Sequence, residues 1–432
     1  MKIVNIVPGF GGTFYCGNCL RDSVLVKTLR SSGHDSVTLP IYLPLTSAGN
    51  PIQTDSPVFY GAVNIYLKQN YKFFRHMPLW LEHFLDSGPI LRYAASKAGS
   101  TRASGLEEMT ISMLMGSEGF QKEELQQLID YLKNHEKPDI VHLSNALLLG
   151  LAEKIKTKLN AKVVCSLQDE DVWVDVMKPA YRDKVWNIIS EKAGYVDAFI
   201  AVSDFYAGVM KKKMNLPDEK LHVIHIGVDP SNYTVYQPSL APPTIGFLSR
   251  LCEENGLGIL VEAFIELKAK EGFADARLRL TGGMTADDKR FINTLQKKLK
   301  KKNILQDVEF MHEFNPETLS VFFKGLSVLS VPVLAGEAFG LYQMEALSSG
   351  IPLVQPALGA FPEIIKRTGG GLVYSPNNSA TLADTFANVL GNPSLLLEMS
   401  KKGRAAVEDH FNNRVLTEKM IRVYEQITEG NT

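Results

Sequence analysis

Two glutamates, Glu337 and Glu345, flank a glycine-containing turn in the segment GEAFGLYQMEALSSG. An apolar run that ends near Val333 precedes them, a helix is expected from Leu341, and a second apolar run begins at Ile351. Open α/β sheets bind ligands at the carboxyl ends of their strands, and the unpaired amides of a first helical turn favour an anion. Such a site holds a diphosphate at the helix while the two carboxylates accept hydrogen bonds from sugar and ribose hydroxyls.

A second group that suits phosphate is Arg250, which follows an apolar run in TIGFLSRLCEENG. A guanidinium is always charged and binds phosphate oxygens in a bidentate manner. In a transfer reaction it would stabilise the negative charge that grows on a leaving phosphate. The two segments together therefore indicate a site for a diphosphate that carries hydroxyl-rich groups.

The segment GEAFGLYQMEALSSG resembles the Glu-x7-Glu signature of the retaining family 4 (group 1) glycosyltransferases, which have the GT-B fold. This resemblance implies that Glu337 binds the transferred sugar close to the reacting carbon and that Glu345 binds the ribose of the nucleotide. It also implies that the backbone amides of Phe339, Gly340 and Leu341 bind sugar hydroxyls and phosphate.

The segment around Arg250 is similar to a second element of the same family. The resemblance implies that Arg250 clamps the donor diphosphate, so that Arg250 and Glu337 are the catalytic residues. Asn255 stands where the family usually has a lysine, which removes one positive charge at the leaving group. We expect Asn255 to lie in the donor site, and we expect a structural role for Glu363 in ALGAFPEII.

Two glycine turns extend the resemblance over most of the chain outside the segment 66–120. Gly282, in LRLTGG, matches a turn after a strand of the donor domain. Gly12, in PGFGGTF, matches the opening glycine loop of the family, where a residue without a side chain permits close approach to phosphate or acceptor. We therefore assign both glycines to the donor site.

The motif CGNC, at residues 16–19, follows the first apolar run and is expected to open a helix. A Cys-x-x-Cys pair in this position is typical of redox sites, whereas a zinc site would need two further nearby ligands, which we do not identify in the sequence. We expect this loop to shape an acceptor site, with Asn18 and Arg21 contacting the acceptor and the thiols of Cys16 and Cys19 incidental or regulatory.

The acceptor side departs from the family pattern. Ser144 stands where many relatives place a histidine, and the run AKVVCSLQ ends in Gln168 before the acidic cluster of Asp169, Glu170 and Asp171. We hypothesise that one carboxylate orients or deprotonates an acceptor hydroxyl, and we assign Ser144, Asp169 and Asp171 to acceptor binding; the alternative is a solvated acidic loop. The resemblance implies no metal and no cofactor, with a nucleotide-diphosphate sugar as co-substrate.

The elements that must position these residues are short apolar runs that alternate with amphipathic helical segments. The alternation predicts two Rossmann-like, doubly wound α/β domains, and the resemblance implies that they face each other across a cleft. The apolar runs are KIVNIVPG, SVTLPIY, VNIYL, PDIVHLS, AKVVCSLQ, DAFIAVS and LHVIHIG, then PTIGFLSR, RLRLTGG, DVEFMHE, SVLSVPV, IPLVQPA and GLVYS.

A proline-rich linker over 231–244 divides the chain into an acceptor domain over 1–235 and a donor domain over 240–411. The segment of about 66–120 is rich in aromatic and basic residues and predicts a helical insertion in the first domain. We expect the C-terminal helix, over 412–432, to pack back on the first domain.

The 432 residues carry a formal net charge of −1 and show no nucleic-acid-binding composition. No run approaches a membrane span, and the N-terminal apolar run is too short for a signal peptide, so we expect a cytoplasmic location. The lysine run from Lys297 to Lys302 predicts a solvated helix face, with peripheral membrane contact as the alternative.

The leading hypothesis is therefore a retaining, metal-independent glycosyltransferase that moves a hexosyl-type sugar to an acceptor hydroxyl on a sugar, a glycolipid or a small molecule. The alternatives are a nucleotide-sugar-binding protein without transferase activity, a GT-B nucleotide-sugar epimerase and, most remotely, a redox protein that depends on Cys16.

Overall fold

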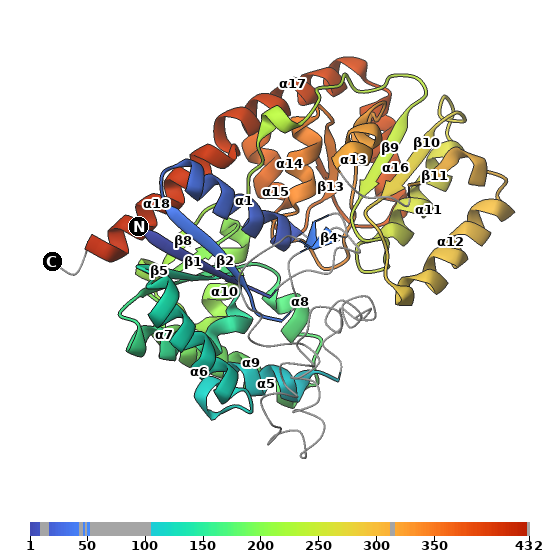
Figure 1. Ribbon diagram of the computed structural model, residues 1–432. Helices are drawn as coiled ribbons and strands as arrows, with labels where there is room; N and C mark the ends of the chain where they lie inside the picture. Colours follow the sequence, from blue (N-terminus) through green and yellow to red (C-terminus); the bar gives the residue numbers. More distant parts are fainter. Residues whose placement is uncertain (9–16, 43–45, 48–49, 52–104, 312–315, 430–432) are drawn as a thin grey trace. The chain divides into compact units, whose positions relative to one another are not determined.

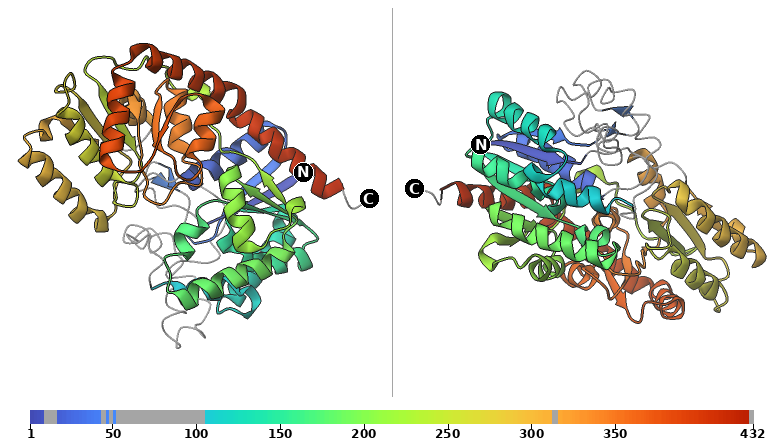
Figure 2. Two further views of the ribbon diagram at one scale, coloured as in Figure 1. Left: turned by 180° about the vertical axis from the view of Figure 1, so that it is seen from behind. Right: turned by 90° about the horizontal axis from the view of Figure 1, so that it is seen from below.

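The computed structural model describes residues 1–8, 17–42, 46–47, 50–51, 105–311 and 316–429. The chain forms two compact units, and each contains a parallel sheet flanked by helices (Figures 1 and 2). The first unit takes the described residues up to Ile224 except Gly17, and those from Thr417 on. The second unit takes Gly17 and His225–Leu416.

The sheet of the first unit consists, in its described part, of β1 (Lys2–Val7), β2 (Asp35–Pro40), β5 (Ile140–Leu143), β6 (Lys162–Leu167), β7 (Ala198–Ala201) and β8 (Leu221–Val223). The spatial order is β2-β1-β5-β6-β7-β8, and every pair is parallel. Helices cover both faces of such a sheet, so strands such as β5 and β7 are buried at every position, and their residues are apolar except for His142 in β5.

Helices of the first unit are α1 (Gly17–Ser31), α5 (Glu107–Leu114), α6 (Lys122–Tyr131), α7 (Ala152–Lys158), α8 (Glu170–Val174), α9 (Pro179–Lys192) and α10 (Asp204–Met214). Short stretches of 3-10 helix lie at Gly116–Glu118, Ala146–Leu151, Ala193–Tyr195 and Asp218–Lys220, and a short π helix lies at Leu132–Glu136. A short antiparallel pair joins β3 (Thr46–Ser47) to β4 (Asn50–Pro51).

The sheet of the second unit consists, in its described part, of β9 (Thr244–Leu248), β10 (Arg277–Thr281), β11 (Val308–Phe310), β12 (Val328–Leu329), β13 (Leu353–Pro356) and β14 (Gly371–Tyr374). The order β11-β10-β9-β12-β13-β14 is again parallel throughout. The winding reverses between β9 and β12, which are neighbours in the sheet. A reversal of this kind opens a crevice at the carboxyl ends of the two strands.

Helices of the second unit are α11 (Leu257–Lys268), α12 (Lys289–Lys301), α13 (Pro316–Phe323), α14 (Leu341–Ser348), α15 (Phe361–Thr368), α16 (Ser379–Leu390) and α17 (Pro393–His410). Single 3-10 turns lie at Pro230–Asn232, Ala286–Asp288 and Leu305–Asp307. No helix in the described residues is long and apolar enough to cross a membrane.

The last helix, α18 (Asn413–Glu429), begins in the second unit and continues into the first. Within the first unit, the Thr28 and Thr417 hydroxyls are 2.7 Å apart, and the Tyr424 hydroxyl lies 2.6 Å from Nδ1 of His142. Nε2 of His142 lies 2.8 Å from the Ser166 hydroxyl. Burial, with a contribution from a nearby arginine, lowers the pKa of His142 to about 3, so the imidazole is neutral and both of its nitrogens are used.

The fold class expected from the sequence is confirmed, and twelve of the thirteen expected strands are present where the apolar runs lie. The other run, VNIYL, lies outside the described residues, as does most of the expected insertion over 66–120, whose last part forms α5. The proline-rich segment packs on the second unit: Tyr236 N–H donates to the Ser349 carbonyl (2.9 Å) and Ser239 N–H donates to the Leu326 carbonyl (2.8 Å).

We predict that Tyr424→Phe lowers the free energy of unfolding of the protein by about 1–3 kcal/mol, because Nδ1 of buried His142 loses its partner. Tyr181→Phe is the matched control: its hydroxyl, 3.3 Å from Glu108, is exposed, and its loss should change stability by less than about 0.5 kcal/mol. Urea unfolding of the two variants measures the difference. Equal stability of the two variants would show that the contact with α18 contributes nothing.

Candidate functional site

The donor-side residues follow the carboxyl ends of neighbouring strands in the second unit. Arg250 comes two residues after β9, and Glu337 lies in the loop between β12 and α14. Because β9 and β12 are adjacent, both segments leave the sheet at its winding reversal. The two loops are joined by the Leu334 N–H, which donates to the Glu254 carbonyl (3.1 Å).

Arg250 is held by two carboxylates. Its Nε lies 3.5 Å from Oδ2 of Asp288, and its Nη2 lies 3.6 Å from Oε2 of Glu254. Asp288 is buried and accepts hydrogen bonds from the amide and the hydroxyl of Thr285, both at 2.8 Å. The Arg250 side chain keeps 18% of its surface exposed, so the guanidinium is oriented and still reachable by an anion.

Asn255, which we expected in the donor site, uses its side-chain amide within the turn. Nδ2 donates to Oγ of Ser249 (2.8 Å) and to the carbonyl of Arg250 (3.1 Å). The Asn255 amide makes both bonds without a charge, whereas a lysine at this position would bring a positive charge into the turn. The structure therefore places Asn255 beside Arg250, where it braces the backbone of the loop that carries the guanidinium.

Gly282 follows β10 and lies against the same loop. Its φ is +122°, and a Cβ at this position would collide with the carbonyl of Ser249. The carbonyl of the next residue, Gly283, accepts a hydrogen bond from the Leu251 N–H (2.9 Å). Only glycine permits this approach, which joins the end of β10 to the Arg250 loop.

The Glu-x7-Glu segment forms a loop followed by a wholly buried helix, α14. Gly340 caps the helix in the left-handed region, at φ +78°. Glu337, half-buried in the loop, accepts a hydrogen bond from the Tyr342 hydroxyl on Oε2 (3.0 Å). Glu345, 4% exposed on the second turn of the helix, accepts one from the Tyr233 hydroxyl on Oε1 (3.1 Å).

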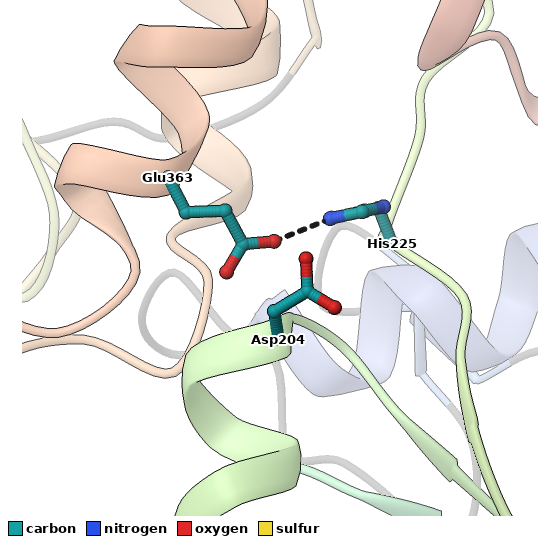
Figure 3. A group of neighbouring side chains, drawn as sticks. All are labelled: Asp204, His225 and Glu363. Atoms are coloured by element: carbon teal, nitrogen blue, oxygen red, sulfur yellow. Dashed lines mark hydrogen bonds and ion pairs between the residues drawn. The ribbon is translucent and has the colours of Figure 1, made fainter.

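Phe339 and Leu341 are buried on either side of Gly340. The Phe339 ring lies near the rings of His225 and Phe411, at centroid distances of 6.0 and 6.3 Å. Nε2 of His225 is in turn 2.7 Å from Oε1 of Glu363 (Figure 3). The side chain of Phe339 is thus an anchor in the core, and its carbonyl accepts a hydrogen bond from Nε2 of Gln343 (2.5 Å), so the backbone amide is the part that could contact a ligand.

The acceptor-side residues of the first unit gather around Arg21 on α1. Nη2 of Arg21 donates to the Ser144 carbonyl (2.6 Å) and to Oδ1 of Asp22 (2.7 Å), and Nη1 donates to Oε1 of Gln168 (3.0 Å). The Ser144 hydroxyl donates to Oδ2 of Asp22 (2.6 Å). This network joins α1 to the carboxyl ends of β5 and β6. The winding of this sheet reverses between β5 and its other neighbour, β1.

Asp169 follows β6 with φ +64°, a left-handed conformation that costs energy for a residue with a side chain. Burial, and then the charge of Asp171, raise the pKa of the Asp169 carboxyl to about 6, while Arg21 and hydrogen bonds from Gln168 and Asn18 act in the opposite direction. Asn18 and Asp169 are therefore in contact, and the carboxyl titrates close to neutrality.

Glu170 and Asp171 share the hydroxyl of Tyr206. Its oxygen lies 2.8 Å from Oε2 of Glu170 and 2.8 Å from Oδ1 of Asp171, and it also accepts the Glu170 N–H (2.7 Å). One phenol hydrogen serves a single carboxylate, so the second short contact needs a proton on a carboxyl group. Burial raises the pKa of the Glu170 carboxyl to about 7, while hydrogen bonds from the Ala146 N–H and the Tyr206 hydroxyl act in the opposite direction, so Glu170 takes up a proton near neutral pH.

The described residues thus bring the assigned donor residues together at one sheet edge of the second unit, and the acceptor residues at one sheet edge of the first. Gly12 and Cys16 lie outside the described residues, and Cys19 lies on α1. Sequence reasoning missed the hydrogen-bond partners of the assigned residues, which are Asp22, Tyr206, Tyr233, Asp288 and Tyr342. Tyr342 alone had a local signal, since it lies on the first turn of the helix that the signature predicts.

Two units with parallel Rossmann-like sheets, with the Glu-x7-Glu helix and an arginine at the winding reversal of the second sheet, have the architecture of the GT-B fold. The family model described as "Glycosyltransferase Family 4" matches residues 114–232, and the family model described as "Glycosyl transferases group 1" matches residues 235–406. The chain belongs to the group 1, family 4 glycosyltransferases.

Among curated relatives, the protein of Escherichia coli named "Putative colanic acid biosynthesis glycosyltransferase WcaL" is 29% identical over 234 residues. That match covers 52% of this chain and 55% of WcaL, so the chain spans about half the length of this curated relative.

Solved structures share the whole fold. Sucrose-phosphate synthase from Thermosynechococcus elongatus has a TM-score of 0.72 at 16% identity, with 100% of both chains covered. HepE from Anabaena, in complex with UDP, has a TM-score of 0.68 at 14% identity and covers 99% of this chain and 100% of its own. At these identities the likeness shows the fold.

We predict that Glu170→Gln changes how stability depends on pH. The pKa of Glu170 is raised from 4.5 to about 7, so the folded state holds a proton that the unfolded state releases, and stability is lost as pH rises between these values. The glutamine keeps the acceptor for the Ala146 N–H and does not ionise. We measure the free energy of unfolding of both proteins at pH 5 and pH 8. Between these two pH values the wild type should lose about 2–3 kcal/mol more stability than the variant.

The control for this prediction is Glu123→Gln, an exposed glutamate on α6, whose stability should follow the wild-type pH dependence. A Glu170→Gln curve that runs parallel to wild type across the range would mean that Glu170 is ionised at pH 5 and that Tyr206 donates to it.

Proposed function

We propose that the protein is a retaining glycosyltransferase that moves a hexosyl-type sugar from a nucleoside-diphosphate sugar to an acceptor hydroxyl. The observation that carries the proposal is the placement of Arg250 and Glu337 after the adjacent strands β9 and β12, with the N-terminus of α14 next to them. That arrangement offers a cation, a helix N-terminus and a carboxylate at one edge of the second sheet.

In this proposal the second unit binds the donor. Arg250 and the first amides of α14 hold the diphosphate, because both favour phosphate oxygens. Glu345 accepts hydrogen bonds from the ribose hydroxyls and Glu337 from hydroxyls of the sugar. Arg250 then stabilises the charge that develops on the diphosphate as it leaves.

The transfer step exchanges one bond for another at the anomeric carbon. The bond between this carbon and the diphosphate oxygen breaks, and its electron pair stays on the phosphate. The acceptor oxygen bonds to the carbon on the face that the phosphate leaves, and the acceptor proton passes to a phosphate oxygen. The configuration is therefore retained.

The acceptor site belongs, in this proposal, to the first unit. The Arg21 guanidinium is already bonded to Asp22, Ser144 and Gln168, so its charge orients the site more than it attracts an anion. Asp169 and Asp171 offer carboxylate oxygens that can orient an acceptor hydroxyl. This chemistry suits a hydroxyl on a sugar, a glycolipid or a small molecule.

In this proposal the reaction needs no metal and no further cofactor, as the sequence led us to expect. The proposed location of the protein is the cytoplasm. The alternatives differ in what they turn over. A nucleotide-sugar-binding protein would bind the donor and leave it intact, while an epimerase would change the sugar and keep it on the nucleotide.

We predict that one nucleotide family stabilises the wild type in a thermal-shift screen against UDP, GDP, ADP and their sugar conjugates. A ligand at about 100 times its dissociation constant adds about 2.7 kcal/mol of stability. Because HepE is known with UDP, UDP is tested first. Arg250→Ala should weaken the binding by about 10- to 100-fold through loss of a charged hydrogen-bond donor.

Arg290→Ala, an exposed arginine on α12, is the matched control and should bind like wild type. If no nucleotide stabilises the folded wild type, or if both arginine variants bind equally well, the assignment of the donor site is wrong.

We predict that the donor is turned over with sugar or glycolipid acceptors from a panel, and that the rate is the same with and without EDTA. We also predict that the product keeps the anomeric configuration of the donor, which proton NMR measures. Glu337→Gln should lower the rate by about 100-fold or more, because it removes charge beside the reacting carbon. Loss of activity in EDTA would contradict metal independence, and an inverted product would contradict the retaining mechanism.

A further inference from the structure

Each glutamate of the Glu-x7-Glu segment accepts a hydrogen bond from a tyrosine hydroxyl. The Tyr342 hydroxyl donates to Oε2 of Glu337 (3.0 Å), and the Tyr233 hydroxyl donates to Oε1 of Glu345 (3.1 Å). The two tyrosines come from different segments, one from the helix itself and one from the chain between β8 and β9. Both pairs lie within the second unit.

Tyr342 is fixed by packing. The residue is 2% exposed, and its ring lies against Gly340: a Cβ at Gly340 would be 3.0 Å from a ring carbon and 3.1 Å from the hydroxyl oxygen. A buried ring fixes the place of its hydroxyl, and a buried phenol is normally hydrogen-bonded. The hydroxyl therefore holds one carboxylate oxygen of Glu337. Glu337 as a whole is half-buried, so it can be reached from solvent.

Tyr233 holds the second glutamate from the other side. Its backbone is tied to the preceding turn, because its N–H donates to the Pro230 carbonyl (3.2 Å). Burial, and then the charge of Glu345, raise the pKa of Tyr233 far above its usual value, so the phenol stays a donor across the working pH range. Glu345 is 4% exposed, and a buried carboxylate needs such donors.

A hydroxyl suits this task better than a cation would. A lysine or arginine would orient the carboxylate but would also neutralise it, whereas a neutral phenol orients the group and leaves its charge to attract hydroxyl hydrogens. With one oxygen tied to tyrosine, a glutamate side chain that has three rotatable bonds is held in one orientation. The carboxylate is therefore oriented before a ligand arrives.

We propose that Tyr233 and Tyr342 are positioning residues of the donor site: Tyr233 orients Glu345 toward the ribose, and Tyr342 orients Glu337 toward the transferred sugar. The inference rests on the proposed function, since it takes the donor and the roles of both glutamates from it. It adds that recognition of the nucleotide and recognition of the sugar are tuned separately, each by one hydroxyl group.

The test compares Tyr233→Phe and Tyr342→Phe with wild type in calorimetric binding of UDP and of UDP-glucose, or of the nucleotide pair that the screen selects. Tyr233→Phe should weaken both ligands equally, by about tenfold, because the ribose is common to them. Tyr342→Phe should leave UDP binding unchanged and weaken UDP-glucose by about tenfold. A general packing defect would not separate the two ligands.

Tyr236→Phe is the matched control. The Tyr236 hydroxyl also makes a side-chain hydrogen bond, at 2.9 Å to Oγ of Ser320, and Tyr236 is three residues from Tyr233, but its partner is not a glutamate of the donor site. It should bind both ligands like wild type. In a Glu345→Gln background the effect of Tyr233→Phe should be largely absent, because the two changes act through one contact.

Three outcomes overturn the inference. If wild type binds the nucleotides and both phenylalanine variants match Tyr236→Phe, the tyrosines do not position the glutamates, while the proposed function stands. If Tyr342→Phe weakens UDP as much as UDP-glucose, Tyr342 acts on the fold of the loop. If wild type binds no nucleotide or nucleotide sugar, the proposed function and this inference fall together.

Discussion

The reversal of winding between β9 and β12 is the constraint on which the donor site depends. From β9 the chain winds toward one edge strand of the sheet and from β12 toward the other, and a reversal of this kind opens a crevice where the two carboxyl ends meet. The segments of Arg250 and Glu337 both emerge there, although more than eighty residues separate them in the sequence. The hydrogen bond between Leu334 and Glu254 then keeps the two loops together without using a side chain that a ligand would need.

Charge is arranged differently in the two units. In the second, Arg250 has Asp288 and Glu254 at 3.5–3.6 Å, and its side chain keeps 18% of its surface exposed. In the first, Arg21 makes close bonds of 2.6–3.0 Å to its own protein. An arginine of the first kind suits an incoming phosphate, and one of the second kind suits the rigid support of a site for neutral groups.

The sequence predicted what depends on neighbours along the chain. The strands were recognisable because both faces of a parallel sheet are covered, and α14 was recognisable from the glycine and glutamate spacing around it. The partners of the assigned residues were not recognisable, because Tyr233 and Glu345 are 112 residues apart and Arg21 and Ser144 are 123 residues apart. Asn255 is the intermediate case: the loss of a charge was visible, but its bonds to Ser249 and to the Arg250 carbonyl required the folded turn.

The spacing of the two glutamates acquires its meaning from the position of Gly340 between them. Glu337 lies three residues before this cap, in a loop whose conformation a helix does not dictate, while Glu345 lies five residues after it on a buried helix. The helix alone can orient the second carboxylate only to within the freedom of its side chain, and the loop orients the first even less. Tyrosine hydroxyls at 3.0 and 3.1 Å remove that remaining freedom at both positions, so the rigid elements and the hydrogen bonds together specify the site.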